Sequence, residues 1–209
     1  MPDYTYLQTY ATCGPDTFEE VIDRYQALLE RLGCTDQLVF SWLMDVQWPA
    51  SDDDNFGDIY ALPFALTPEL NCDGLAVSLY TEAAVPSVED QPAWLGFNLF
   101  FENSVVHQDH STIYISGFGG QIWLIMQAMA KSFPEIGVYL TDEYQENHAW
   151  RALAEKAGAD PWAFDLAIFP RQLAPHFSEV PAGFQGTVLE NKFGFALQNR
   201  WHLLPWQEA

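Results

Sequence analysis

The sequence predicts an α+β fold with a mainly antiparallel sheet of about five to seven strands and one long N-terminal helix. Two observations support this prediction. Between residues 38 and 101, short apolar runs are separated by connectors rich in Pro, Gly, Asn and Asp, which is typical of strands joined by turns. In three other stretches the pattern is helical: residues 18–32, about 120–132 and about 142–157.

The N-terminal region is expected to contain a strand followed by the long helix. Aromatic and β-branched residues alternate from Tyr4 to Tyr10, as they do in a strand. Thr17 and Glu20 then have the spacing of a capping box, which favours the start of a helix, and Gly33 is a suitable end. The apolar positions of this amphipathic helix are Val21, Ile22, Tyr25, Leu28, Leu29 and Leu32.

The middle of the chain is expected to supply most of the sheet. Its apolar runs predict four strands, at Leu38–Val46, Ile59–Leu66, Leu75–Tyr80 and Trp94–Phe101. The connectors between them carry most of the acidic residues, which places those residues on the surface.

The next unit has the order strand, helix, strand. Thr112–Ser116 is expected to be a short strand, Gln121–Ser132 a helix and Gly137–Leu140 another strand, joined as a right-handed crossover. The helix is apolar on nearly every side, so we expect it to be the buried central element of the core.

The C-terminal region predicts a further helix at Asp142–Ala157, with acids in its first turn and Lys156 in its last. A short helix ending near Phe169, a loop over residues 170–186 and a final strand at Gly194–Leu204 complete the pattern. The chain has no internal repeat and no low-complexity linker, so residues 1–209 are expected to form a single globular domain.

Composition narrows the classes of function. The chain is 49% hydrophobic, so it can build a core, but its net charge of −21 opposes binding to a nucleic-acid backbone or an anionic membrane. No apolar run reaches the roughly 18 residues that span a bilayer, and the N-terminus lacks the pattern of a signal peptide. The three cysteines form no C-x-x-C pair, which indicates buried free thiols in a reducing compartment. We therefore expect a cytoplasmic protein without a cofactor.

One long stretch of the chain contains no cation. Between Arg31 and Lys131 there is no Lys or Arg, but there are thirteen acidic residues: Asp36, Asp45, Asp52, Asp53, Asp54, Asp58, Glu69, Asp73, Glu82, Glu89, Asp90, Glu102 and Asp109. These carboxylates have no neighbouring cation in the sequence, so most of them are expected to face water, a metal or a basic partner.

The acidic loop after Trp48 is the first candidate site. Its spacing fails as an EF-hand, because Phe56 occupies a ligand position and Pro63 replaces the last Glu. A large aromatic anchor beside charged groups is instead typical of an interaction hot spot. The expected partner-contacting residues are Trp48, Asp52, Asp53, Asp54, Asp58, Glu89 and Asp90.

A metal site is the alternative. Glu102, His107, Asp109 and His110 lie close together in the sequence and could coordinate a divalent ion that activates water. However, His-x-x-His is not a specific spacing, and no H-E-x-x-H motif is present. The G-x-G-x-x-G and G-x-S-x-G motifs also fail around Gly117.

The sequence thus favours a non-enzymatic, acidic protein-binding domain. The predicted partner is a basic protein, and the predicted biological form is a bacterial immunity or antitoxin protein that covers the active or nucleic-acid-binding surface of a basic toxin. Two alternatives remain open: a metal-dependent hydrolase built on the Glu/His/Asp/His cluster, and a structural subunit of a homo-oligomer.

Overall fold

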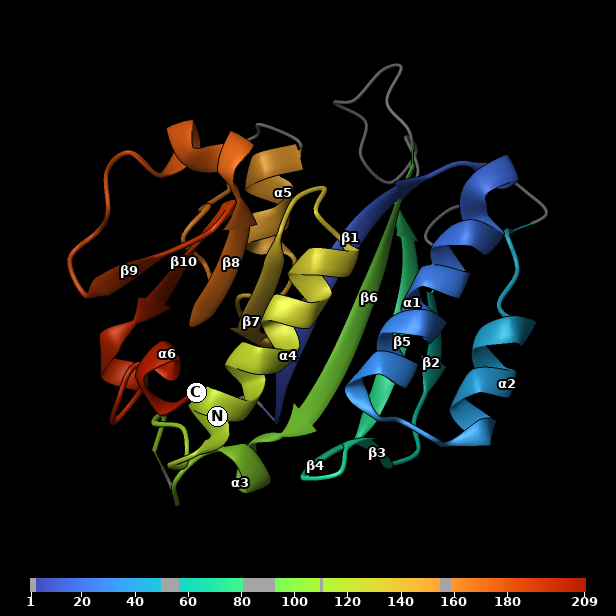
Figure 1. Ribbon diagram of the computed structural model, residues 1–209, viewed down its shortest axis with the longest axis horizontal. Coiled ribbons are helices and arrows are strands. Elements are labelled where there is room, and N and C mark those ends of the chain that lie inside the picture. The colour runs from blue at the N-terminus through green and yellow to red at the C-terminus, as the bar shows by residue number, and fades with distance from the viewer. Residues whose placement is uncertain (1–2, 50–56, 81–92, 110, 155–158) are drawn as a thin grey trace.

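The computed structural model describes residues 3–49, 57–80, 93–109, 111–154 and 159–209 (Figure 1). Eight strands form one sheet in the order β2-β5-β6-β1-β7-β8-β10-β9, and every neighbouring pair is antiparallel. A separate hairpin pairs β3 with β4. The strand bounds are β1 Tyr4–Cys13, β2 Gly57–Tyr60, β3 Phe64–Thr67, β4 Leu70–Cys72, β5 Gly74–Tyr80, β6 Ala93–Glu102, β7 Val138–Asp142, β8 Leu166–Pro170, β9 Phe184–Leu189 and β10 Lys192–Leu197. The predicted α+β fold with an antiparallel sheet is confirmed, with one strand more in the main sheet than the upper expectation.

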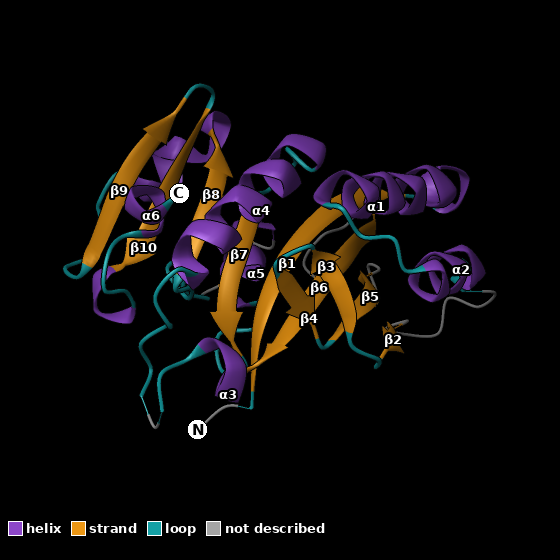
Figure 2. Cartoon of the chain, turned by 60° about the horizontal axis from the view of Figure 1, so that its bottom comes forward, coloured by secondary structure: helices purple, strands orange, loops and turns teal. Residues whose placement is uncertain are grey.

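Helices cover both faces of this sheet (Figures 1 and 2). One face packs against α1 and α4 in a core that includes Leu7, Leu75, Leu99 and Leu140. The other face packs against α5 through an aromatic core that includes Tyr10, Tyr139, Trp150 and Phe169. The helix bounds are α1 Phe18–Leu32, α2 Gln37–Asp45, α3 Asn103–Val106, α4 Phe118–Ser132, α5 His148–Ala154 and α6 Pro205–Glu208, with short 3-10 helices η1 Pro15–Thr17, η2 Arg171–Phe177 and η3 Gln198–Arg200.

The long N-terminal helix is confirmed as α1. Its predicted apolar stripe faces the core, and it ends at Gly33, whose φ of 100° is the left-handed conformation that glycine adopts readily. The predicted capping box is absent, because the Thr17 hydroxyl accepts from the Gly14 N–H at 2.9 Å and makes no cap with the helix itself. The 3-10 turn η1 precedes α1 directly, so the backbone is already helical before the first residue of α1.

The buried central helix is confirmed as α4. Phe118, Ile122, Met126 and Met129 are buried, although Leu124 on the outer side is exposed. At its N-terminus the Glu208 carboxylate of α6 accepts from the Gly120 N–H at 3.1 Å. A carboxylate is favoured there because it faces the positive end of the helix dipole.

Two predictions in the middle of the chain are wrong. Leu38–Val46 is not a strand, because the segment forms α2, whose N-cap Asp36 accepts from the Leu38 N–H at 2.8 Å. Val39, Leu43 and Val46 are the buried residues of this segment, and their spacing of four and three is helical. The predicted strand Ile59–Leu66 is divided into β2 and β3, which belong to different sheets on either side of Pro63.

The predicted crossover is present, but its first strand was placed wrongly. Residues 112–116 contain only an isolated bridge from Tyr114 to His107, so α4 instead connects β6 and β7. Both strands pair antiparallel with β1, one on each side, and they are therefore parallel to each other across it.

The C-terminal predictions hold only in part. The helix expected from Asp142 begins at His148, because the Asp142 carboxylate accepts from the Tyr144 and Gln145 N–H groups and forms a turn instead. The expected short helix ending near Phe169 is strand β8, the expected loop contains η2 and the start of β9, and the final strand β10 ends at Leu197. Among the described residues, no helix is long and apolar enough to cross a bilayer.

Candidate functional site

Charge is distributed unequally between the two halves of the sheet. Residues 1–109 carry 19 Asp and Glu against two Arg, whereas residues 110–209 carry 10 acidic against six basic residues. The first group supplies β2, β5, β6 and β1, which are neighbours in the sheet, together with α1 and α2. Thirteen of these 19 acids are described, and most of them belong to the elements on the side of α1 and α2 in Figure 1.

Both arginines of residues 1–109 make their contacts at the C-terminal end of α4. Arg24 donates to the Ser132 carbonyl at 2.7 Å, pairs with Glu135 at 2.8 Å and lies over the Phe133 ring. Arg31 donates to the Ser132 hydroxyl at 3.0 Å. Both arginines thus face the end of α4, so they do not neutralise the opposite flank of α1.

On that flank, α1 and α2 enclose a groove of about 420 Å³, which we call the α1–α2 groove. Its apolar residues are Phe18, Ile22, Leu43, Met44, Val46 and Trp48. Phe18 and Trp48 pack edge to face with ring centroids 5.6 Å apart. Met44 is 67% exposed, so the groove presents apolar surface to water.

The charged residues that line the α1–α2 groove are both acidic. Glu19 and Asp23 lie four residues apart on α1 and are exposed, and Gln26 continues the same side of the helix. Among the described lining residues there is no Lys, Arg or His. The groove thus places the exposed Met44 and the half-buried Trp48 beside an anionic wall, an arrangement that attracts a cationic and partly apolar ligand.

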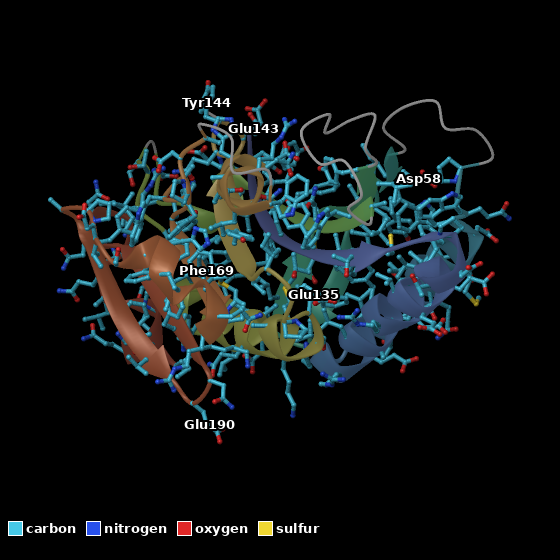
Figure 3. The ribbon with its side chains drawn as sticks, turned by 90° about the horizontal axis from the view of Figure 1, so that it is seen from above. Asp58, Glu135, Glu143, Tyr144, Phe169 and Glu190 are labelled. Atoms are coloured by element: carbon cyan, nitrogen blue, oxygen red, sulfur yellow. The ribbon has the colours of Figure 1, made fainter. Side chains whose placement is uncertain are left out.

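Only part of the sequence-based contact set can be placed. Trp48 lines the α1–α2 groove, whereas Asp58 lies on the edge strand β2, where its carboxylate accepts from the Ile59 N–H at 2.9 Å. Asp52, Asp53, Asp54, Glu89 and Asp90 lie outside the described residues. Figure 3 shows Asp58 at the opposite end of the molecule from Glu190, which lies between β9 and β10.

The groove acids Glu19 and Asp23 were not predicted as site residues. On α1 alone they belong to an ordinary solvated face, and the groove exists only because residues 37–45 form a helix beside them. Asp36 followed by Val39 and Leu43 was the signal for that helix, since an N-cap residue precedes apolar residues at a spacing of four.

A second cavity, the α3 cleft, has a volume of about 790 Å³ and lies where β1, β6 and β7 meet α3. Three residues of the predicted metal cluster line it: Glu102, His107 and Asp109. His110 lies outside the described residues. Among the described residues, no three His, Cys, Asp or Glu side chains are grouped so that they could hold a metal ion.

His107 is held in its neutral form. Burial, followed by the nearby Arg200 cation, lowers the pKa of His107 to about 4. The ring packs against Tyr114 with centroids 4.4 Å apart, and Nε2 is buried without a hydrogen-bond partner among the described residues. Glu102 is engaged elsewhere, because its carboxylate accepts from the Ser104 hydroxyl at 2.7 Å.

The floor of the α3 cleft is an ion network centred on Arg200. The guanidinium donates to Asp165 at 2.9 Å, to Asp142 at 3.2 Å and to the Thr112 carbonyl at 3.3 Å. Tyr114 donates its hydroxyl proton to the other oxygen of Asp165 at 2.9 Å. Burial raises the pKa of Asp165 to about 6 despite these partners. Each charged group of the network thus has an oppositely charged partner within the protein.

A third polar cluster lies on the α5 side of the sheet. Asn147, which directly precedes α5 and has a left-handed φ of 63°, accepts through its amide oxygen from Tyr10, Tyr80 and Gln8. Burial raises the pKa of the adjacent Glu146. This cluster fixes the turn before α5 against β1 and β5.

Comparison of the chain with models of known protein families, with curated proteins and with solved structures found no match. Function must therefore be argued from the chemistry of the sites. Of the three polar sites, the α1–α2 groove is the one that exposes apolar surface beside carboxylates and has no cation among its described lining residues.

Proposed function

We propose that this protein is a binding domain whose acidic side docks a basic protein partner. The observation that carries the proposal is the segregation of charge: both arginines of residues 1–109 face α4, while the α1–α2 groove, with Met44 exposed at its edge, has carboxylates on the other flank of α1. An anionic face of this kind accelerates the encounter with a cationic protein, and apolar anchors then slow its dissociation.

The biological form that this chemistry favours is a bacterial, cytoplasmic immunity or antitoxin protein. Such a protein acts by occlusion, since a basic toxin that attacks nucleic acid needs its cationic cleft free. The acids of the cation-free stretch support this role: of the seven that are described, none forms an ion pair with another described residue, because the described ion pairs involve Arg24 and Arg200. Trp48 supplies the aromatic anchor at the groove.

Co-expression with the basic product of a neighbouring gene tests this function. We expect the two proteins to co-purify at low ionic strength and to separate as the salt concentration rises through about 0.3 M. Co-expression is also expected to abolish the toxicity of the basic partner. Binding that is insensitive to salt, or a partner set without a basic protein, would overturn the proposal. A stable homo-oligomer without any partner in gel filtration would favour a structural subunit instead.

A further inference from the structure

The walls of the α1–α2 groove limit what can occupy it. The two helices are joined by residues 33–36 alone, so they form an antiparallel pair. Most lining residues come from α1 up to Gln26, from the last turn of α2 and from residues 46–48 that follow it. Gln26 of α1 donates to the Phe40 carbonyl of α2 and ties the helices together. Pro15, which begins η1, lies at the other end of the lining.

The apolar surface that an occupant can contact lies at the edge of the groove. Phe18, Ile22, Leu43 and Val46 are buried in the core below it, and Met44 and Trp48 stand at its edge. Methionine is flexible and polarisable, which lets it adapt to an incoming side chain. A volume of about 420 Å³ admits a few side chains and not a folded segment, so the occupant must lie across the groove and insert its apolar residues.

The anionic wall sets the charge of the occupant. Glu19 and Asp23 are separated by about 6 Å along the helix axis, since each residue rises about 1.5 Å. Two Lys or Arg side chains four residues apart on another helix have the same spacing. An occupant with apolar residues on one stripe and cations on the adjacent stripe therefore matches both the apolar lining residues and the anionic wall.

The backbone of the walls favours a helical occupant over an extended one. The lining residues Ile22, Asp23 and Gln26 lie inside α1, where backbone groups are bonded within the helix, so the α1 wall offers no row of free groups that could pair with an added strand. A helix satisfies its own backbone and needs only side-chain contacts.

We infer that the α1–α2 groove binds an amphipathic helix of the basic partner, with apolar residues in the groove and Lys or Arg residues against Glu19 and Asp23. This inference rests on the proposed function and names the partner element that the groove recognises. The recognition is a helix-in-groove mode, in which anchors at positions i, i+3, i+4 and i+7 enter the groove.

A fluorescein-labelled model peptide of about 16 residues tests the inference, because shorter helices are marginal in water. The peptide carries Leu at i, i+3, i+4 and i+7 and Lys four residues apart on the adjacent stripe, and its control has the same residues in scrambled order. Fluorescence anisotropy is expected to show saturable binding of the amphipathic peptide, at least about tenfold tighter than the scrambled one.

Two variants of α2 form a matched pair. Met44 lines the groove and is 67% exposed, whereas Leu38 is 65% exposed and is not among the lining residues. Met44→Lys is expected to weaken peptide binding at least about tenfold, and Leu38→Lys, with the same change of charge, less than about threefold. Both substitutions replace exposed side chains, and circular dichroism verifies that the variants are folded.

A second pair separates the groove from the general acidic field. Glu19→Gln/Asp23→Asn removes two charges from the groove, and Glu30→Gln/Glu69→Gln removes two from exposed sites outside its lining. The first pair is expected to weaken binding at least about fivefold more than the second. Equal effects within either pair, or equal binding of the scrambled peptide, would overturn the groove assignment. The proposed function would then still stand if a basic partner bound with strong salt dependence, and it would fall only if none did.

Discussion

Removal of the Arg200 cation is expected to destabilise the protein far more than removal of a surface cation. The Arg200 side chain is 13% exposed and that of Asp165 only 1%, so Arg200→Met leaves a nearly fully buried carboxylate without its cation. The loss of one partner from a buried ion pair costs about 3–5 kcal/mol. Arg31→Met is the matched control, because Arg31 is exposed and a substitution at such a surface site usually changes stability by about 0.5 kcal/mol or less.

The pH dependence of this loss identifies its cause. In the wild-type protein the pKa of Asp165 is raised to about 6, so between about pH 4 and pH 6 the folded state binds more protons than the unfolded state. This group's contribution to stability therefore falls as pH rises through that window. Without Arg200 the pKa of Asp165 rises further, and the penalty for its ionised form is larger at pH 7.5 than at pH 5.

Urea unfolding followed by tryptophan fluorescence at pH 5 and pH 7.5 measures both effects. Arg200→Met/Asp165→Asn is expected to recover part of the stability lost at pH 7.5, because the buried negative charge is gone. A loss below about 1 kcal/mol in Arg200→Met, a loss that is the same at both pH values, or no recovery in the double variant would refute the reasoning.

Three further predictions concern particular contacts. Asn147→Ala removes the acceptor of three hydrogen bonds and puts alanine at a φ of 63°, so the free energy of unfolding is expected to fall by about 2–4 kcal/mol in urea titration. Gly194→Ala is expected to lose about 1–3 kcal/mol in the same assay, because its Cβ would lie 2.7 Å from the Trp123 ring, whereas Gly14→Ala has open space and should be nearly neutral. The His107 ring, with its pKa lowered to about 4, is expected to stay neutral at pH 5 in NMR titration, and a titration midpoint near 6.5 would contradict this. The contribution of His107 to the free energy of unfolding is expected to fall as pH drops from about 6.5 towards 4, because the unfolded state then binds more protons.

Much of the fold could be read from local patterns. α1 and α4 follow from apolar residues at helical spacing or from a helix-length apolar run, and β1, β5 and β6 from short runs between turn residues. α2 was mistaken for a strand because a short apolar run that includes Val39 and Phe40 satisfies either pattern. There the Asp36 cap and the packing against α1 decided the outcome.

The candidate site could be predicted only in its chemistry. Trp48 was identified as an anchor from its acidic surroundings, and it lies in the α1–α2 groove. The groove itself was not predicted, because it requires Glu19 and Asp23 of α1 to face Met44 of α2. Arg200 could not be paired with Asp142 and Asp165 either, since they are 58 and 35 residues away in the sequence.

The sequence by itself determined the sign of the charge, the apolar content and the class of fold, because each of these depends on composition or on spacing within a few residues. The tertiary structure alone decided where the charge lies and which carboxylates form ion pairs with Arg24 or Arg200. Arg24 and Arg31 turn towards Ser132, about a hundred residues further along the chain, only because α1 packs beside α4. That packing leaves the other flank of α1 anionic, so the binding surface is a product of long-range contacts.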